Sequence, residues 1–283
     1  MFNLYENTKI LQNTKKSAGV FARTLLILTT VALLGAVSAT FAQPGKPSRP
    51  EQRIISDLSL TWNQPTSPLD PRKLVANTRE FPYSAIVKLR ITFPDNYVVE
   101  GTGALIAANK VLTAEHLVYK IAHGGHFQRA EVMPGYSANY ESCKKVLSLN
   151  YNHGSHQGCH DGAECDIAVL NTQEDVGCGT GWFGFKIPTA SDLNQVYIAG
   201  YPDDLYGGER LVVAGGRANF AQSSYHNILS YTDIWTGSGQ SGAPIFTSDY
   251  YIIGVHTFGT SQSNYGDALC NQLFSTIYNW TRQ

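Results

Sequence analysis

Ser241 stands in a sequence context that suits a nucleophile. It lies between two glycines in the segment Gly239–Gly242. Glycine permits a tight turn, and in such a turn two successive backbone N–H groups can face one oxyanion. A serine there could attack a carbonyl carbon, although glycine-serine turns are also common in ordinary loops. The motif therefore needs support from elsewhere in the chain.

Two upstream segments supply a candidate base and a candidate carboxylate. Residues 103–116 read as strand, turn and strand, with His116 at the end, and Asp166 opens the apolar run 167–170. Histidine can accept the serine proton near neutral pH, and an aspartate can fix its tautomer and stabilise the imidazolium. Taken singly, His116 could be a core histidine and Asp166 a strand cap. Asp161 competes with Asp166, but no apolar strand follows it.

The composition predicts an ordinary globular protein. The chain has 283 residues, a net charge of −1 and 43% hydrophobic residues, which is enough for a sizeable core. The near balance of charge argues against a polybasic surface for nucleic acid. Only 15% of the residues are charged and glycine is abundant, which favours short strands and turns over long helices.

Alternating hydrophobicity predicts an all-β fold. Apolar residues recur at every second position from Val87 to Phe93, as in a half-buried strand, and a return strand starts at 97–101. Further short strands are expected at 103–106, 111–113, 167–170, 196–199, 211–213, 228–232, 244–246 and 251–255. Many short strands with glycine-rich turns indicate a barrel or a sandwich. The tail 270–280 has helical spacing of its apolar residues and predicts a C-terminal helix.

The N-terminal part indicates export and processing. Basic residues precede the apolar run 25–37 and small residues follow it, which is the pattern of a secretory signal peptide. The run is shorter than the ~20 residues that a membrane span needs. We expect a signal peptide of residues 1–42, with a cut after Ala39 as the alternative. The proline-rich segment 43–69 is typical of a propeptide or linker, and the folded domain should begin near Asp70.

Cysteines and histidines raise a second possibility, a metal site. The chain has five cysteines, an odd number that leaves at least one thiol unpaired within a monomer, and Cys143 with Cys159 is a candidate pair. One polar loop holds His153, His156, Cys159, His160 and Cys165. These residue types bind zinc, but they show no recognised ligand spacing here. A solvated surface loop is the favoured interpretation.

The order His116, Asp166, Ser241 resembles that of chymotrypsin-fold serine proteases. Five motifs resemble the glutamyl endopeptidase branch: Asn77–Thr78 before Phe81–Val87, Val111–His116, Gly200–Pro202, Gly239–Pro244 and Gly254–His256. The resemblance covers roughly residues 70–283. Two residues depart from it. Glu115 precedes the histidine where the family has a small residue, and Ala243 replaces a serine or glycine.

This resemblance implies a fold and a site. The fold would be chymotrypsin-like, two six-stranded β-barrels at about 70–180 and 181–283 with a C-terminal helix. His116, Asp166 and Ser241 would be the catalytic residues, and the N–H groups of Gly239 and Ser241 would form the oxyanion hole.

The resemblance also implies a substrate preference. Thr236 and His256 stand where this branch binds a substrate glutamate. Their hydroxyl and imidazole N–H groups could donate to its carboxylate. Trp235 stands where trypsin-like enzymes carry an aspartate, so cleavage after Lys or Arg is not expected.

We therefore expect a secreted serine endopeptidase that acts on proteins or peptides, preferentially after glutamate. It would be extracellular, or periplasmic if the source has an outer membrane. It would be a monomer with no cofactor, no metal, no nucleic-acid partner and, once the signal is removed, no membrane partner. The alternative is an inactive, protease-shaped binding protein that holds a metal in the histidine-rich loop. Glu115 is the departure that motivates this alternative.

Overall fold

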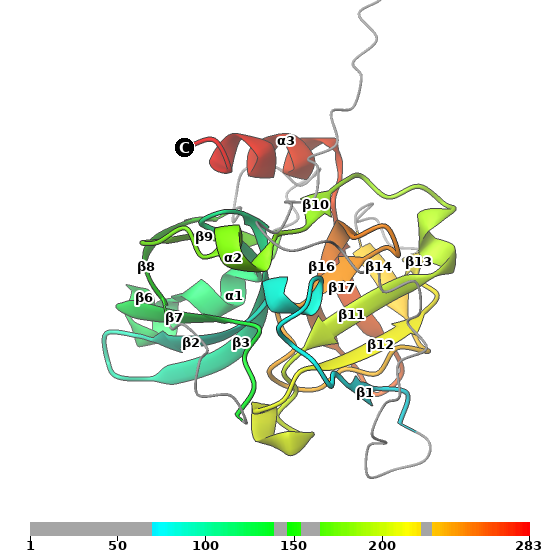
Figure 1. The fold of residues 1–283 in the computed structure, drawn as a ribbon, viewed down its shortest axis with the longest axis horizontal. Coiled ribbons are helices and arrows are strands. Elements are labelled where there is room, and N and C mark those ends of the chain that lie inside the picture. The colour runs from blue at the N-terminus through cyan, green and yellow to red at the C-terminus, as the bar shows by residue number, and fades with distance from the viewer. Residues whose placement is uncertain (1–69, 139–145, 154–164, 222–227) are drawn as a thin grey trace, which may run out of the picture. The chain divides into compact units, whose positions relative to one another are not determined.

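Two β-sheets dominate the part of the chain that the computed structural model describes, residues 70–138, 146–153, 165–221 and 228–283 (Figure 1). The first sheet is a closed, antiparallel barrel of six strands. In barrel order these are β2 (Ile86–Thr92), β3 (Val98–Ala107), β4 (Lys110–Thr113), β9 (Ala168–Thr172), β8 (Val146–His153) and β7 (Arg129–Pro134).

The second sheet has nine strands. Eight of them follow the order β1 (Lys73–Leu74), β12 (Val212–Gly216), β11 (Val196–Gly200), β15 (Pro244–Phe246), β16 (Tyr251–Gly259), β17 (Asn264–Ala268), β14 (Ile228–Tyr231) and β13 (Asn219–Phe220). The ninth, β10 (Gly184–Phe185), pairs with β16 in parallel. The all-β, chymotrypsin-like fold class is confirmed. The two-residue strands β1, β10 and β13 extend this sheet beyond the six strands that were expected.

Helical segments are few and mostly short. They are α1 (Glu115–Val118), α2 (Gly177–Thr180), α3 (Asn271–Trp280) and the 3₁₀ turns Tyr83–Ala85, Ile121–His123, Asp192–Asn194 and Tyr206–Gly208, and a two-stranded ribbon joins β5 (Tyr119–Lys120) to β6 (Gly125–His126). The predicted C-terminal helix is confirmed as α3, which buries Leu273 and Ile277. Its N-cap is Cys270, a free thiol. Both members of the predicted Cys143–Cys159 pair lie outside the described residues.

The strand β2, with its alternating apolar residues, shows how the sequence builds the first barrel. Val87, Leu89 and Ile91 are fully buried, as their period of two predicts. Lys88 is also buried, because its ammonium lies 2.6 Å from Glu209 and 3.0 Å from Glu100. Burial of a charge is tolerated when partners of the opposite sign meet it. A side chain expected to face water is therefore used in an ion-pair cluster.

Several sequence-based expectations fall outside the described residues. These are the signal peptide, the proline-rich segment 43–69 and most of the histidine-rich loop at 154–164. No helix in the described ranges is long and apolar enough to cross a membrane. Within the same ranges, no group of three or more His, Cys, Asp or Glu side chains could hold a metal ion.

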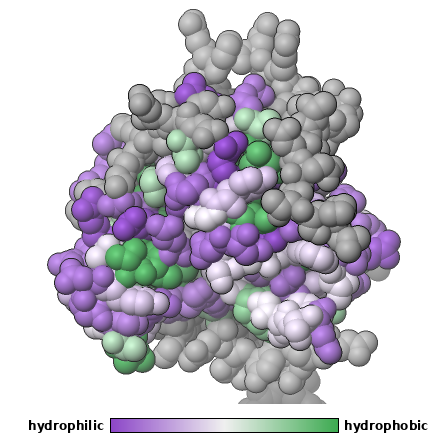
Figure 2. All heavy atoms as spheres, turned by 90° about the horizontal axis from the view of Figure 1, so that it is seen from below, coloured by the Kyte–Doolittle hydropathy of each residue, from purple (hydrophilic) through white to green (hydrophobic). Residues whose placement is uncertain are grey.

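The face seen in Figure 2 is mostly hydrophilic, with hydrophobic residues in small, separate groups. The exposed large hydrophobic side chains of the described chain are Tyr97, Val98, Ile121, Tyr206, Phe220, Trp235 and Phe258. Single exposed apolar side chains are normal for a soluble surface. Two of these, Trp235 and Phe258, flank the segments that carry the candidate specificity residues Thr236 and His256.

Candidate active site

Strand pairing in the first barrel brings His116 and Asp166 together. Antiparallel pairing of β4 with β9 places Thr113 opposite Ala168. His116 follows the end of β4, in the short helix α1, and Asp166 precedes the start of β9. Because antiparallel strands end and begin at the same edge, the two residues meet there. Fifty residues of sequence separation are thereby reduced to direct contact.

Asp166 binds His116 at two points. The His116 backbone N–H donates to Asp166 Oδ1 at 2.8 Å, and His116 Nδ1 lies 2.5 Å from Asp166 Oδ2. An ionised carboxylate only accepts hydrogen bonds, so the ring proton belongs on Nδ1 and Nε2 is free to accept. Both side chains are partly exposed, at 36% and 29%. A substrate could therefore reach an imidazole already oriented as a base.

Ser241 lies in a turn of the second sheet that its neighbours hold rigidly. The Gln240 side chain accepts the Gly237 N–H at 3.0 Å, and the Gln240 N–H donates to the Gly237 carbonyl at 3.1 Å. From the first barrel, Thr102 donates its hydroxyl to the Gly239 carbonyl at 2.8 Å and its N–H to the Ser241 carbonyl at 2.9 Å. The turn is thus fastened to the barrel that carries His116.

The glycine after Ser241 lies against the end of β4. Gly242 has a φ of +83°, and a Cβ on it would lie 2.2 Å from Thr113 Oγ1 and 3.0 Å from the Ala114 nitrogen. This places Ser241 beside the strand end that leads to His116. Among the described residues no hydrogen bond joins the Ser241 hydroxyl to His116. Catalytic hydrogen bonds are often loose before a substrate binds, so the arrangement remains compatible with proton transfer.

Replacing Gly242 by alanine should abolish activity and destabilise the fold by more than ~2 kcal/mol, since the new methyl group meets backbone and has no room. Gly207 is the matched control. Its φ is +60°, yet a Cβ there would meet nothing within 4 Å. Gly207→Ala should cost only about 1–2 kcal/mol for the left-handed backbone. Chemical denaturation and peptide hydrolysis measure both variants. Equal losses in the two would contradict the close approach.

The N–H groups of Gly239 and Ser241 are available for an oxyanion. No hydrogen bond within the described chain engages either of them. Gly239 has a φ of +87°, and a Cβ on it would lie 2.3 Å from the Tyr201 carbonyl oxygen. Only glycine fits this conformation, so the sequence motif and the backbone agree. Two free donors flanking a serine are what an oxyanion hole requires.

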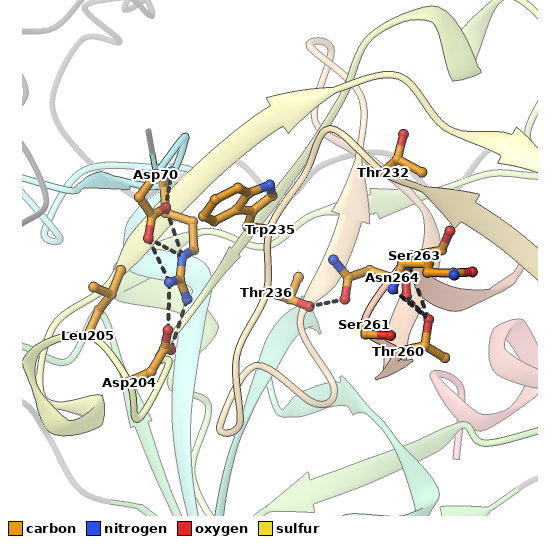
Figure 3. Close-up of a pocket in the computed structure, with 12 residues that line it drawn as sticks. Asp70, Asp204, Leu205, Thr232, Trp235, Thr236, Thr260, Ser261, Ser263 and Asn264 are labelled. Atoms are coloured by element: carbon orange, nitrogen blue, oxygen red, sulfur yellow. Dashed lines mark hydrogen bonds and ion pairs between the residues drawn. The ribbon is translucent and has the colours of Figure 1, made fainter. Parts of the chain in front are cut away.

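Thr236 lines a cavity of about 520 Å³ (Figure 3). Its hydroxyl donates to Asn264 Oδ1 at 2.8 Å, and the Asn264 amide donates to the Ile234 carbonyl at 2.8 Å. The hydroxyl proton is therefore already engaged, and Thr236 can donate to a substrate only by leaving Asn264. Trp235 lines the same cavity and is 45% exposed.

The opposite part of the cavity lining carries an ion-pair cluster. The Arg72 guanidinium lies 2.7 Å from Asp70 and 2.6 Å from Asp204. Both carboxylates are thus bound by one internal cation, which leaves neither free for a substrate lysine or arginine. Nothing in the sequence marks Arg72, Asp204 or Asn264 as pocket residues, because the contact of Arg72 with Asp204 spans 132 residues and that of Asn264 with Thr236 spans 28.

His256 is buried on β16 and is not among the residues lining that cavity. Its Nδ1 lies 2.5 Å from the Tyr231 hydroxyl and 3.0 Å from the Tyr265 carbonyl. Burial lowers the pKa of His256 to about 4, so the imidazole is neutral near pH 7. Tyr265 follows Asn264 on β17, and Asn264 contacts Thr236. Thr236 and His256 therefore contact neighbouring residues of one strand, without a shared hydrogen bond.

A further carboxyl lies next to this group. The Asp166 N–H donates to Asp267 Oδ2 at 2.7 Å, and burial raises the pKa of Asp267 to about 7. His256 and Asp267 consequently respond to pH in opposite ways. The unfolded chain gains a proton at His256 as the pH falls from 6.5 to 4, which removes stability. The folded protein keeps a proton on Asp267 that the unfolded chain loses above about 4, so stability falls as the pH rises towards 7.

These opposite dependences predict variants with opposite slopes. In His256→Gln the free energy of unfolding should fall more steeply with rising pH than in the wild type, because only Asp267 remains. In Asp267→Asn it should rise more steeply between pH 4 and 6.5. Each slope should change by at most about 1.4 kcal/mol per pH unit, the value for one proton. Urea denaturation at several pH values measures this, and parallel curves for all three proteins would contradict it.

Comparisons relate the chain to known proteins by sequence and by fold. A family model described as Trypsin matches residues 73–281. A glutamyl endopeptidase of Bacillus licheniformis is 30% identical over 224 residues, 75% of this chain and 67% of that protein. An extracellular metalloprotease of Bacillus subtilis is 26% identical over 268 residues, 87% of this chain and 80% of that protein. A solved Glu endopeptidase in complex with MPD is 28% identical, with a TM-score of 0.64 over 76% of this chain and 98% of that chain.

Two curled β-sheets, with a serine in a glycine-rich turn where they meet, define the chymotrypsin-like class of hydrolases. The chain belongs to the trypsin family of serine proteases. Its substrates are accordingly proteins or peptides. The resemblance to glutamyl endopeptidases that the sequence motifs indicated is confirmed by a curated relative and by a solved structure.

Proposed function

We propose that this chain is an endopeptidase in which Ser241 attacks the scissile carbonyl, His116 takes its proton and Asp166 orients His116. The observation that carries the proposal is the double hydrogen bond from His116 to Asp166. His116 then returns the proton to the leaving amine, and the N–H groups of Gly239 and Ser241 stabilise the oxyanion. A water molecule that gives its proton to His116 then hydrolyses the acyl ester on Ser241 and restores the free serine.

Active-site labelling tests this proposal. A fluorophosphonate should label the purified protein on Ser241, and the labelled protein should have lost peptide hydrolysis. A chelator should leave hydrolysis unchanged. This arm is informative because one relative is named a metalloprotease. Absence of labelling together with loss of activity on chelation would reject the serine mechanism and favour a metal in the histidine-rich loop.

The proposal includes a preference for glutamate before the scissile bond. The relative from Bacillus licheniformis is a glutamyl endopeptidase, and Thr236 and His256 are the candidate ligands of the carboxylate. To present an Nε2 proton to the substrate, His256 would give up its Nδ1 contact with the Tyr265 carbonyl at 3.0 Å. The Tyr231 hydroxyl, which donates to the same carbonyl at 3.1 Å, would turn to donate to His256 Nδ1. Thr236 would turn its hydroxyl from Asn264 to the substrate. Cleavage after Lys or Arg is disfavoured, because Arg72 already binds both nearby aspartates.

Peptides that differ only before the scissile bond should show this preference. We expect kcat/KM to be roughly 10- to 100-fold higher for Glu than for Gln, from hydrogen bonds to a charged group worth about 1.5–3 kcal/mol. His256→Ala should remove most of that ratio. His126, an exposed histidine on β6, is the matched control, and His126→Ala should keep that ratio. Better cleavage after Leu or Phe than after Glu would contradict the preference.

A further inference from the structure

Asp267 connects the second sheet to the candidate catalytic pair of the first barrel. It lies on β17, where its Cα partners are Val255 of β16 and Ile228 of β14. Its Oδ2 accepts the N–H of Asp166, which belongs to the segment entering β9. One hydrogen bond of 2.7 Å thus crosses from one sheet to the other directly behind the carboxylate that holds His116.

The strand β16, which pairs with β17, holds the serine turn. The Gly242 N–H donates to the His256 carbonyl at 2.8 Å, and the His256 N–H donates to the Ala243 carbonyl at 2.8 Å. Ser241 is therefore fastened to β16 through its two following residues. Asp166 is fastened to β17, the neighbour of β16, through Asp267. The nucleophile and the carboxylate share one rigid frame.

We propose that Asp267 is a positioning residue for hydrolysis, which holds the Asp166–His116 pair in register with Ser241 and adds a second carboxyl beside that pair. This inference rests on the proposed Ser241–His116–Asp166 mechanism. Its mechanical part follows from the sensitivity of proton transfer to geometry, because a displacement of about 1 Å can cost roughly 100-fold in rate. Without an acceptor at position 267, the Asp166 N–H has no fixed partner across the sheet boundary.

The electrostatic part concerns the charge of the second carboxyl. The titratable groups around Asp267 are Asp166 and His116 from the first barrel, Tyr231 on β14 and His256 on β16. Tyr231 and His256 are neutral near pH 7, because burial raises the pKa of the first and lowers that of the second. An ionised Asp267 therefore acts chiefly on the Asp166–His116 pair. Because its pKa is about 7, Asp267 ionises as the pH rises through neutrality, and its charge then stabilises the imidazolium that His116 forms during proton transfer.

Two substitutions separate the two parts. Asp267→Asn keeps an oxygen that can accept the Asp166 N–H and removes the charge. Asp267→Val has an apolar side chain that suits a strand and removes both the acceptor and the charge. We expect Asp267→Val to lower kcat by roughly 10- to 100-fold with KM within about twofold. Asp267→Asn should recover most of kcat at pH 6, where the wild-type carboxyl is protonated, and its ratio of kcat at pH 8 to kcat at pH 6 should be roughly two- to threefold lower than that of the wild type, which gains the charge over this range.

The measurements are kcat and KM on one peptide from about pH 5 to 9, the rate of fluorophosphonate labelling, and the thermal midpoint as a check of folding. If the wild type is not labelled on Ser241, the proposed mechanism fails and this inference fails with it. If the wild type is labelled and Asp267→Val matches it in rate and pH profile, only the inference is overturned. If Asp267→Val does not fold, Asp267→Asn decides, since a ratio of kcat at pH 8 to kcat at pH 6 equal to that of the wild type would reduce Asp267 to a structural residue and overturn the proposal.

Discussion

Ser241→Ala should lower kcat for peptide hydrolysis by at least ~10⁴-fold while KM stays within about threefold. The substitution removes the oxygen that attacks the carbonyl and leaves the turn intact, because the hydrogen bonds of the turn use the Ser241 carbonyl and the Gln240 side chain. Binding and the oxyanion donors remain, so a small residual activity is expected. Single-turnover hydrolysis with enzyme in excess can resolve a loss of this size.

Ser238→Ala is the matched control for this prediction. Ser238 is exposed in the same glycine-rich turn, and its contact there is a backbone one, the carbonyl that accepts the Asp203 N–H at 2.7 Å. Loss of the Ser238 hydroxyl should leave kcat within about twofold of the wild-type value. The assignment of Ser241 would be refuted if Ser241→Ala kept more than about one hundredth of the wild-type rate.

Much of the fold could be predicted because its signals are local. The period of two between Val87 and Phe93 depends only on burial of one face of a strand, and all four apolar side chains are fully buried. The C-terminal helix likewise follows from the spacing of Leu273 and Ile277. The strands β7 and β8 were not predicted, because sequences such as Arg129–Pro134 mix charged and apolar residues without clear alternation.

The residues of the candidate site also differ in whether local sequence could identify them. His116 and Asp166 could be named as partners from sequence, because each stands at a strand end and their order with Ser241 resembles that of chymotrypsin-fold proteases. The structure adds that the two strands pair. Asp267 could not be found, because its polar strand carries no motif and its role depends on a contact 101 residues away. Nor could the sequence show that the Thr236 hydroxyl is already engaged. That depends on the side chain of Asn264, which reaches across from β17.

The two sheets contribute different parts of the site. The first barrel supplies His116 and Asp166, and the second sheet supplies Ser241 with the cavity beside Thr236. In the proposed mechanism, hydrolysis therefore depends on the boundary between the two sheets. The hydrogen bonds of Thr102 to the serine turn and of Asp166 to Asp267 are the described contacts that fix this boundary nearest the site.

Asp166→Asn should lower kcat by about 10⁴-fold near pH 7 with little change in KM or stability. The asparagine oxygen can still accept the His116 N–H, which Asp166 Oδ1 now accepts at 2.8 Å. Its amide nitrogen then faces His116 Nδ1 and donates to it, which moves the ring proton to Nε2. An imidazole protonated on Nε2 cannot take the proton of Ser241. The opposite amide orientation would set two donors against each other at the His116 backbone.

The chain offers Asp161→Asn as a control, since Asp161 is the other aspartate that the sequence allowed as the partner of His116. That variant should keep kcat within about twofold. The two proteins are compared in peptide hydrolysis and in fluorophosphonate labelling, because labelling of Ser241 also needs the base. A similar loss in both variants, or a loss confined to Asp161→Asn, would show that Asp166 does not orient His116. If only Asp166→Asn loses activity and its thermal midpoint is unchanged, the cause of the lost hydrolysis is the histidine tautomer rather than folding.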